Sequence, residues 1–157
     1  MTARISAQDA HLLPHDEEAE RSVIGALLID PDALLRAQEA GLTAADFWDR
    51  RLGWIYEAAQ ALAMRREPVE LLSMSHELEH VQEGTEGNRL DLLGGASELI
   101  GLMNSTATSV HAGYYAEIVR RDARRRQLIA AGAEIAATSH AHDGDLGELY
   151  DRVSQIL

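Results

Sequence analysis

Apolar residues recur every three or four positions along most of the chain, the spacing that lines one face of an α-helix. Glycine, proline and polar segments interrupt this spacing at intervals, as expected where helices end. The pattern predicts helices over residues 14–30, 32–40, 49–66, 69–81, 92–104, 109–140 and 146–157, with a short turn at 44–48. The fold class is therefore predicted to be all-α.

The first two predicted helices have recognisable ends. Asp16 follows Pro14 and precedes two glutamates, and acidic residues are favoured at the positive amino-terminal end of a helix. Asp30 and Pro31 are typical of a helix start, with the aspartate as cap and the proline in the first turn. Gly41 is a good terminator for the helix that follows.

The last two helices are predicted to form a hairpin. In the closing helix, apolar residues are spaced three, four and three apart, which gives a narrow stripe that needs a partner helix. An isolated helix of 12 residues is marginal in water, so we expect this stripe to serve self-association. The predicted oligomer interface consists of Leu128, Gly132, Ile135, Leu146, Leu149, Val153 and Ile156.

These elements divide the chain into three predicted parts. Residues 1–13 are expected to form a flexible arm, and residues 14–106 a compact helical bundle. Residues 107–157 are expected to form a protruding helical hairpin used in oligomerisation.

Composition supports this interpretation and narrows the class of protein. Apolar residues make up 46% of the chain and aromatic residues only 4%, with 3 prolines, a balance that favours helices. There is no cysteine, which excludes disulfides and thiolate ligands. The amino terminus lacks the apolar core of a signal peptide, and no apolar run is long enough to span a bilayer. The sequence therefore predicts a soluble cytoplasmic protein.

The charged residues exclude two classes of site. The net charge of −12 argues against broad binding to a nucleic-acid backbone, which requires cationic side chains. All 14 basic residues are arginine. Without lysine, these residues cannot form a Walker-A nucleotide site or a Schiff base.

The segment from Arg120 to Arg126 contains five arginines in seven residues. Such a run suits phosphate binding, but it suits salt bridges to acidic neighbours equally well. Because the chain is strongly acidic, salt bridges are the favoured interpretation, and a partner subunit is a candidate neighbour. The candidate residues are Arg120, Arg121, Arg124 and Arg125.

The stretch from His76 to His80 matches the H-E-x-x-H signature of zinc peptidases. On a helix, however, both histidines point away from the apolar stripe of Leu71, Met74, Leu78 and Val81. A solvated helix face is therefore favoured over a metal site. The alternative function is a zinc-dependent hydrolase that uses His76, Glu77 and His80.

A third zinc ligand is difficult to find in the sequence. An extended H-E-x-x-H-x-x-G-x-x-H pattern would need glycine at position 83 and histidine at 86, and both are glutamates. Glu98 could be a third zinc ligand of another type, but no sequence pattern supports this choice. His140 and His142, near the expected hairpin turn, are interpreted as solvated residues.

Three stretches together resemble the N-terminal domain of DnaB-type replicative DNA helicases. The first resembles a P-x-x-x-E-A-E-x-S-V-L-G opening that is followed in the family by an apolar run and an aspartate. Residues 83–89 look like an insertion of about six residues relative to that family. The stretches are LPHDEEAERSVIGALLIDPDAL, LTAADFWDRRLGWIYEAAQALAMRREPVELLSM and LLGGASELIGLMNSTATSVHAGYYAEIVRRDARRRQLI.

The resemblance implies a non-catalytic domain that forms a collar on a hexameric helicase ring, often as a trimer of dimers. Hairpins would pair between subunits, and the collar would dock primase or a helicase loader. ATP and Mg²⁺ would belong to a separate RecA-like motor domain, which this chain is expected to lack. The resemblance therefore implies a homo-oligomer without cofactor, with no strong direct binding to nucleic acid and none to membranes.

Overall fold

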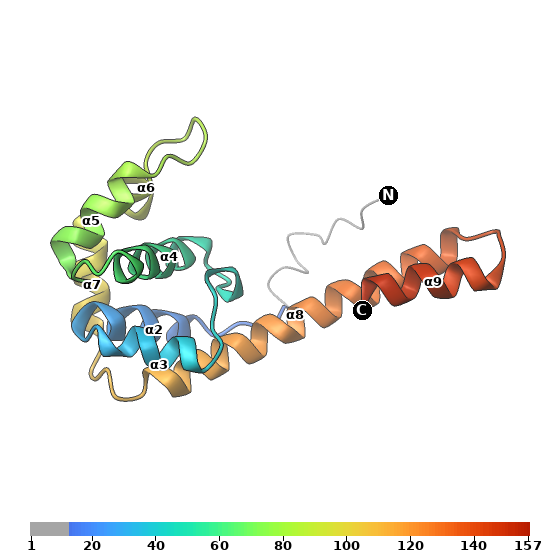
Figure 1. Cartoon of the computed structure of the whole chain (residues 1–157), viewed down its shortest axis with the longest axis horizontal. Coiled ribbons are helices and arrows are strands. Elements are labelled where there is room, and N and C mark those ends of the chain that lie inside the picture. Colours follow the sequence, from blue (N-terminus) through green and yellow to red (C-terminus); the bar gives the residue numbers. More distant parts are fainter. Residues whose placement is uncertain (1–12) are drawn as a thin grey trace. The chain divides into compact units, whose positions relative to one another are not determined.

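The computed structural model describes residues 13–157, and this part of the chain is helical without a β-strand, as predicted (Figure 1). The flexible arm expected at residues 1–13 falls almost entirely outside the described residues. No helix within the described part is both long and apolar enough to cross a membrane. The elements are α2 (Glu17–Ile29), α3 (Asp32–Glu39), the 3₁₀ turn η1 (Ala44–Asp46), α4 (Arg50–Met64), α5 (Leu71–His80), α6 (Arg89–Leu93), α7 (Ala96–Ser105), α8 (Ala112–Ala141) and α9 (Leu146–Ile156).

The chain forms two compact units. One contains His15–Asp122, and the other contains Ala123–Leu157. The first turns of α8 belong to the bundle unit because Ala112, Ala116 and Val119 are buried in its core. The bundle therefore extends beyond residue 106, where the sequence pattern places its end.

Helix α2 is the centre of the bundle. Its residues from Val23 to Leu28 are all buried, and it packs against α3, α4 and α7. Helix α7 lies close to α2 at Gly25, where a side-chain Cβ would be 2.6 Å from the Leu102 carbonyl oxygen. Glycine at this position therefore allows the two backbones to touch.

The residues predicted to mark the ends of the first two helices lie at those ends, although Pro31 and not Asp30 is the N-cap of α3. Asp16 caps α2, and its carboxylate accepts a hydrogen bond of 2.9 Å from the Ala19 N–H. Asp30 accepts a 3.0 Å bond from the Asp32 N–H at the start of α3. Gly41 follows α3 with a φ of +79°, a conformation that suits glycine best. Local capping chemistry thus determines the boundaries of the first two helices.

Asp30 also ties α3 to the segment that precedes α8. Its carboxylate accepts hydrogen bonds from Arg36 at 2.6 Å and from the Ser109 hydroxyl at 3.0 Å. The bond from Arg36 is the largest cause that lowers the pKa of Asp30. Arg36 bonds the Ser109 carbonyl oxygen as well, at 3.2 Å. This network fixes the chain as it enters α8.

The segment at 83–89, expected to be a polar loop, is anchored to α4. Arg50 and Arg89 lie over the Trp54 ring, 5.4 Å and 5.5 Å from its centre. Glu83 accepts a bond of 2.7 Å from each arginine. The loop is closed by α6, a helix that the sequence pattern does not predict and that ends where Gly94 turns to positive φ.

Candidate functional site

The second unit is a helical hairpin, as the sequence predicts. Figure 1 shows α9 running back beside the last turns of α8. Asp145 caps α9 by accepting a bond of 2.9 Å from the Gly147 N–H. In the turn, a ring nitrogen of His142 lies 2.7 Å from the Asp145 carbonyl oxygen. Both contacts are local, so the turn is set by its own sequence.

Helix α9 has an apolar stripe but no buried residue. Part of the stripe is half-buried within the hairpin unit, and Ile156 lines a hollow there together with Glu134, Thr138 and Arg152. The predicted interface residues that are half-buried in this way are Ile135, Leu149, Val153 and Ile156.

The remaining predicted interface residues are exposed. Leu128 is 67% exposed and Leu146 is 65% exposed, and a Cβ built at Gly132 would meet no atom within 4 Å. Tyr150, which follows Leu146 by four residues, is also exposed and was not among the predicted residues. Its place on the same helix face was the signal that could have identified it. The hairpin therefore presents apolar side chains from both of its helices.

The arginine run divides between the two units. Arg120 donates a hydrogen bond of 3.2 Å to the Ala40 carbonyl oxygen at the end of α3. It thereby stabilises the negative carboxyl end of that helix within its own chain. Arg121 pairs with Asp122 at 3.1 Å, and Arg124 bonds Gln127 at 3.1 Å. Pairing with a partner subunit therefore remains a prediction mainly for Arg121, Arg124 and Arg125, which are exposed.

The H-E-x-x-H motif lies on α5, with both histidines exposed and Met74 and Leu78 buried, as predicted. Glu77, the candidate general base, is bound to Arg65 at 2.6 Å. Glu98, the conceivable third ligand, pairs instead with Arg21 at 3.4 Å. In the described part of the chain, no three His, Asp or Glu side chains are grouped so that they could hold a metal ion. The geometry thus gives no support to a zinc hydrolase.

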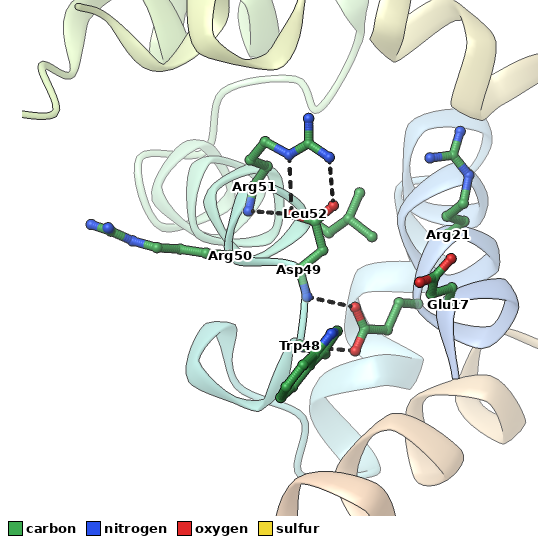
Figure 2. A pocket seen from close by; sticks show the side chains of 8 residues that line it. Glu17, Arg21, Trp48, Asp49, Arg50, Arg51 and Leu52 are labelled. Carbon is green, nitrogen blue, oxygen red and sulfur yellow. Dashed lines mark hydrogen bonds and ion pairs between the residues drawn. The ribbon is translucent and has the colours of Figure 1, made fainter. Parts of the chain in front are cut away.

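A hollow of about 410 Å³ lies between the starts of α2 and α4 (Figure 2). In its lining, the buried Glu20 accepts hydrogen bonds through its carboxylate from the Trp48 N–H at 2.7 Å and the Asp49 N–H at 3.1 Å. Asp49 also holds Arg51 at 3.0 Å. Because these polar groups bind one another, the arrangement joins α2 to the start of α4 and is structural. The sequence pattern does not identify Glu20, since a glutamate in a first helical turn is usually solvated.

Replacing Glu20 with glutamine should destabilise the bundle. An amide offers one oxygen where the carboxylate offers two, so the Trp48 or the Asp49 N–H is left facing an NH₂ group. We expect the free energy of unfolding to fall by about 1–3 kcal/mol, since a donor left unsatisfied inside a protein costs about that much. Urea denaturation followed by circular dichroism would measure it. Glu17→Gln, on the same hollow but exposed, should change stability by less than about 0.5 kcal/mol.

Comparisons of the sequence and of the structure with known proteins point to the same family. The family model described as "DnaB-like helicase N terminal domain" matches residues 12–121. The crystal structure of the N-terminal domain of DnaB helicase from Mycobacterium tuberculosis superposes with a TM-score of 0.81 at 32% identity. The superposition covers 92% of this chain and 96% of that one.

Two curated relatives are similar over most of the chain. The replicative DNA helicase DnaC of Bacillus subtilis is 32% identical over 146 residues, which cover 93% of this chain and 31% of that protein. The replicative DNA helicase DnaB of Mycobacterium leprae is 33% identical over 141 residues, 88% of this chain and 22% of that protein. The chain spans less than a third of the length of either relative.

Proposed function

Because this chain belongs to the DnaB-like helicase N-terminal domain family, we propose that it is a non-catalytic assembly domain of a replicative DNA helicase. Its role is to bring helicase subunits together into a hexameric ring in the cytoplasm and to dock primase or a helicase loader. ATP hydrolysis with Mg²⁺ is assigned to a RecA-like motor domain of the helicase. The absence of lysine supports this assignment, because these residues cannot supply a Walker-A loop.

The observation that supports assembly most strongly is the exposed apolar surface of the hairpin. Leu128 on α8 and Leu146 and Tyr150 on α9 are each more than half exposed in the single chain. Removing exposed apolar side chains such as these from water, by contact with another molecule, is energetically favourable. A second copy is the expected occupant, because paired hairpins would cover equivalent surfaces on each other.

The predicted interface residues are expected to act in two groups. Ile135, Leu149, Val153 and Ile156 are half-buried in the single chain, so they hold α9 on α8 and shape the surface. Leu128, Gly132 and Leu146 are exposed and are proposed to contact the second copy directly. Substitutions in the first group should weaken the hairpin and association together, whereas those in the second should affect association alone.

Gly132→Leu tests the direct contact. In the single chain a side chain at this position enters open space, so folding should be unaffected or slightly improved by the better helix propensity. A partner helix packed closely against Gly132 would meet the new side chain. Overpacking costs about 1–3 kcal/mol, so we expect the dissociation constant of the oligomer to rise about tenfold to a hundredfold. Light scattering across a concentration series would measure it.

Gly101→Leu is the matched control for this experiment. Gly101 is also an exposed helical glycine with no atom within 4 Å of a built Cβ, but it lies on α7 in the bundle unit. Its substitution should leave association unchanged. Equal association in the wild type and Gly132→Leu would contradict the proposed contact, as would a wild-type chain that stays monomeric at tens of micromolar.

A further inference from the structure

The two histidine rings of α5 lie one helical turn apart on an exposed surface. The ring centres of His76 and His80 are 4.8 Å apart and tilted by 45°. A zinc-like ion about 2.0–2.1 Å from one nitrogen of each ring, at a near-tetrahedral angle, also places ring centres about 5 Å apart. The observed spacing of the ring centres is therefore compatible with an ion shared by the two rings.

The hydrogen bond made by His80 prepares its second nitrogen for a metal. Nδ1 of His80 lies 2.7 Å from the His76 carbonyl oxygen. Because a carbonyl oxygen only accepts, Nδ1 holds the ring proton and donates. Nε2 of the neutral ring then has a free lone pair, and backbone bonds of this kind fix the tautomer and orientation of metal-binding histidines.

The surroundings favour binding without catalysis. Both histidines border a hollow of about 510 Å³ with apolar Leu62 and Leu72 in its lining. Glu77 lies there too, but its carboxylate is bound to Arg65 at 2.6 Å. A carboxylate paired in this way is neither a third ligand nor a base for an attacking water.

We propose that His76 and His80 form a two-histidine clamp for a divalent transition-metal ion of the zinc or nickel kind. Water completes the coordination, and the ion bridges the last turn of α5, just before the segment at 83–89. A bound ion stabilises the folded state, because the unfolded chain does not hold the two rings together. This inference is independent of the proposed assembly function and involves no hydrolysis.

Equilibrium dialysis of the untagged protein against Ni²⁺ and Zn²⁺, with thermal unfolding alongside, tests the proposal. We expect the protein to bind one equivalent of metal ion, which raises Tm. His76→Ala and His80→Ala should each lower the affinity for the ion at least about tenfold. Ni²⁺ should bind more tightly than Co²⁺, following the usual order for nitrogen ligands, and Mg²⁺ should have no effect.

Two further variants define the ligand set. Glu77→Gln should bind the ion as the wild type does, because the carboxylate is engaged by Arg65. His142→Ala should also leave the bound equivalent of metal ion unchanged, since that histidine lies in the hairpin turn. Loss of binding in either variant would overturn the proposal, as would a bound equivalent that survives replacement of both His76 and His80.

Discussion

Gly25→Ala is expected to lower the free energy of unfolding by about 2–3 kcal/mol, although alanine is normally the better helix former. The added methyl would overlap the Thr106 Oγ1 atom and lie 2.6 Å from the Leu102 carbonyl oxygen. The carbonyl belongs to the backbone of α7 and cannot move aside as a side chain can. The helices must separate, and the core around α2 then loses packing.

Thermal unfolding should show this as a fall in Tm of about 10 °C, given the usual relation between stability and Tm for a chain of this size. Gly101→Ala, on the partner helix α7, is the control, because its Cβ would meet nothing within 4 Å. It should raise stability by up to about 1 kcal/mol. Equal effects of the two substitutions would show that Gly25 is not a contact point.

A second substitution removes one of the clashes at Gly25. Thr106→Ala removes the Oγ1 atom but leaves the Leu102 carbonyl oxygen and the Cβ of residue 106 in place. We therefore expect Gly25→Ala to cost less in a Thr106→Ala background than in the wild type. A double-mutant cycle would give a coupling of at least about 0.5 kcal/mol for two residues in contact.

Local signals in the sequence were enough to place most helices. The capping bonds of Asp16 and Asp30 and the positive φ of Gly41 involve only neighbours within three residues, so these helix ends can be recognised without a tertiary structure. The apolar stripe of α5 was equally reliable, because burial follows helical spacing. The all-α fold and the solvated positions of both histidines followed from these signals.

Contacts between distant segments could not be predicted in this way. Glu20 binds the Trp48 and Asp49 N–H groups, 28 and 29 residues away, and looks like an ordinary surface glutamate in the sequence. The reason for glycine at position 25 is its contact with α7, which only the tertiary structure reveals. The short helix α6 depends on Asn88 capping and on the loop anchored by Glu83, so its five residues had too little periodicity to be detected.

For the candidate interface, helical spacing identified the apolar stripes. It could not show which of these residues pack inside the hairpin and which are exposed on its surface. Leu149 and Val153 are half-buried, whereas Leu146 is exposed on the same helix. That division depends on how α9 lies on α8, which spacing alone leaves open. It decides which residues are suitable for a test of association.

The double substitution Leu128→Asp and Leu146→Asp should abolish association while preserving the fold. Both leucines are exposed in the single chain, so each aspartate can remain hydrated, and position 146 is the first residue of α9, where negative charge is favourable. In an oligomer both would be charged groups in an apolar contact. Losing the burial of two leucines costs about 3 kcal/mol or more, so we expect the dissociation constant to rise more than a hundredfold.

Leu72→Asp is the matched control for this effect. Leu72 is 75% exposed, close to the values for Leu128 and Leu146, but it lies on α5 in the bundle unit. Sedimentation velocity of the three proteins at equal concentration would compare their association, with circular dichroism to confirm equal helix content. If Leu72→Asp dissociated the oligomer and the double variant did not, the interface would lie on the bundle and not on the hairpin. We expect only the double variant to dissociate the oligomer. Because Leu72→Asp removes an equally exposed leucine from the bundle unit, this result would mean that the two hairpin leucines contact a second copy.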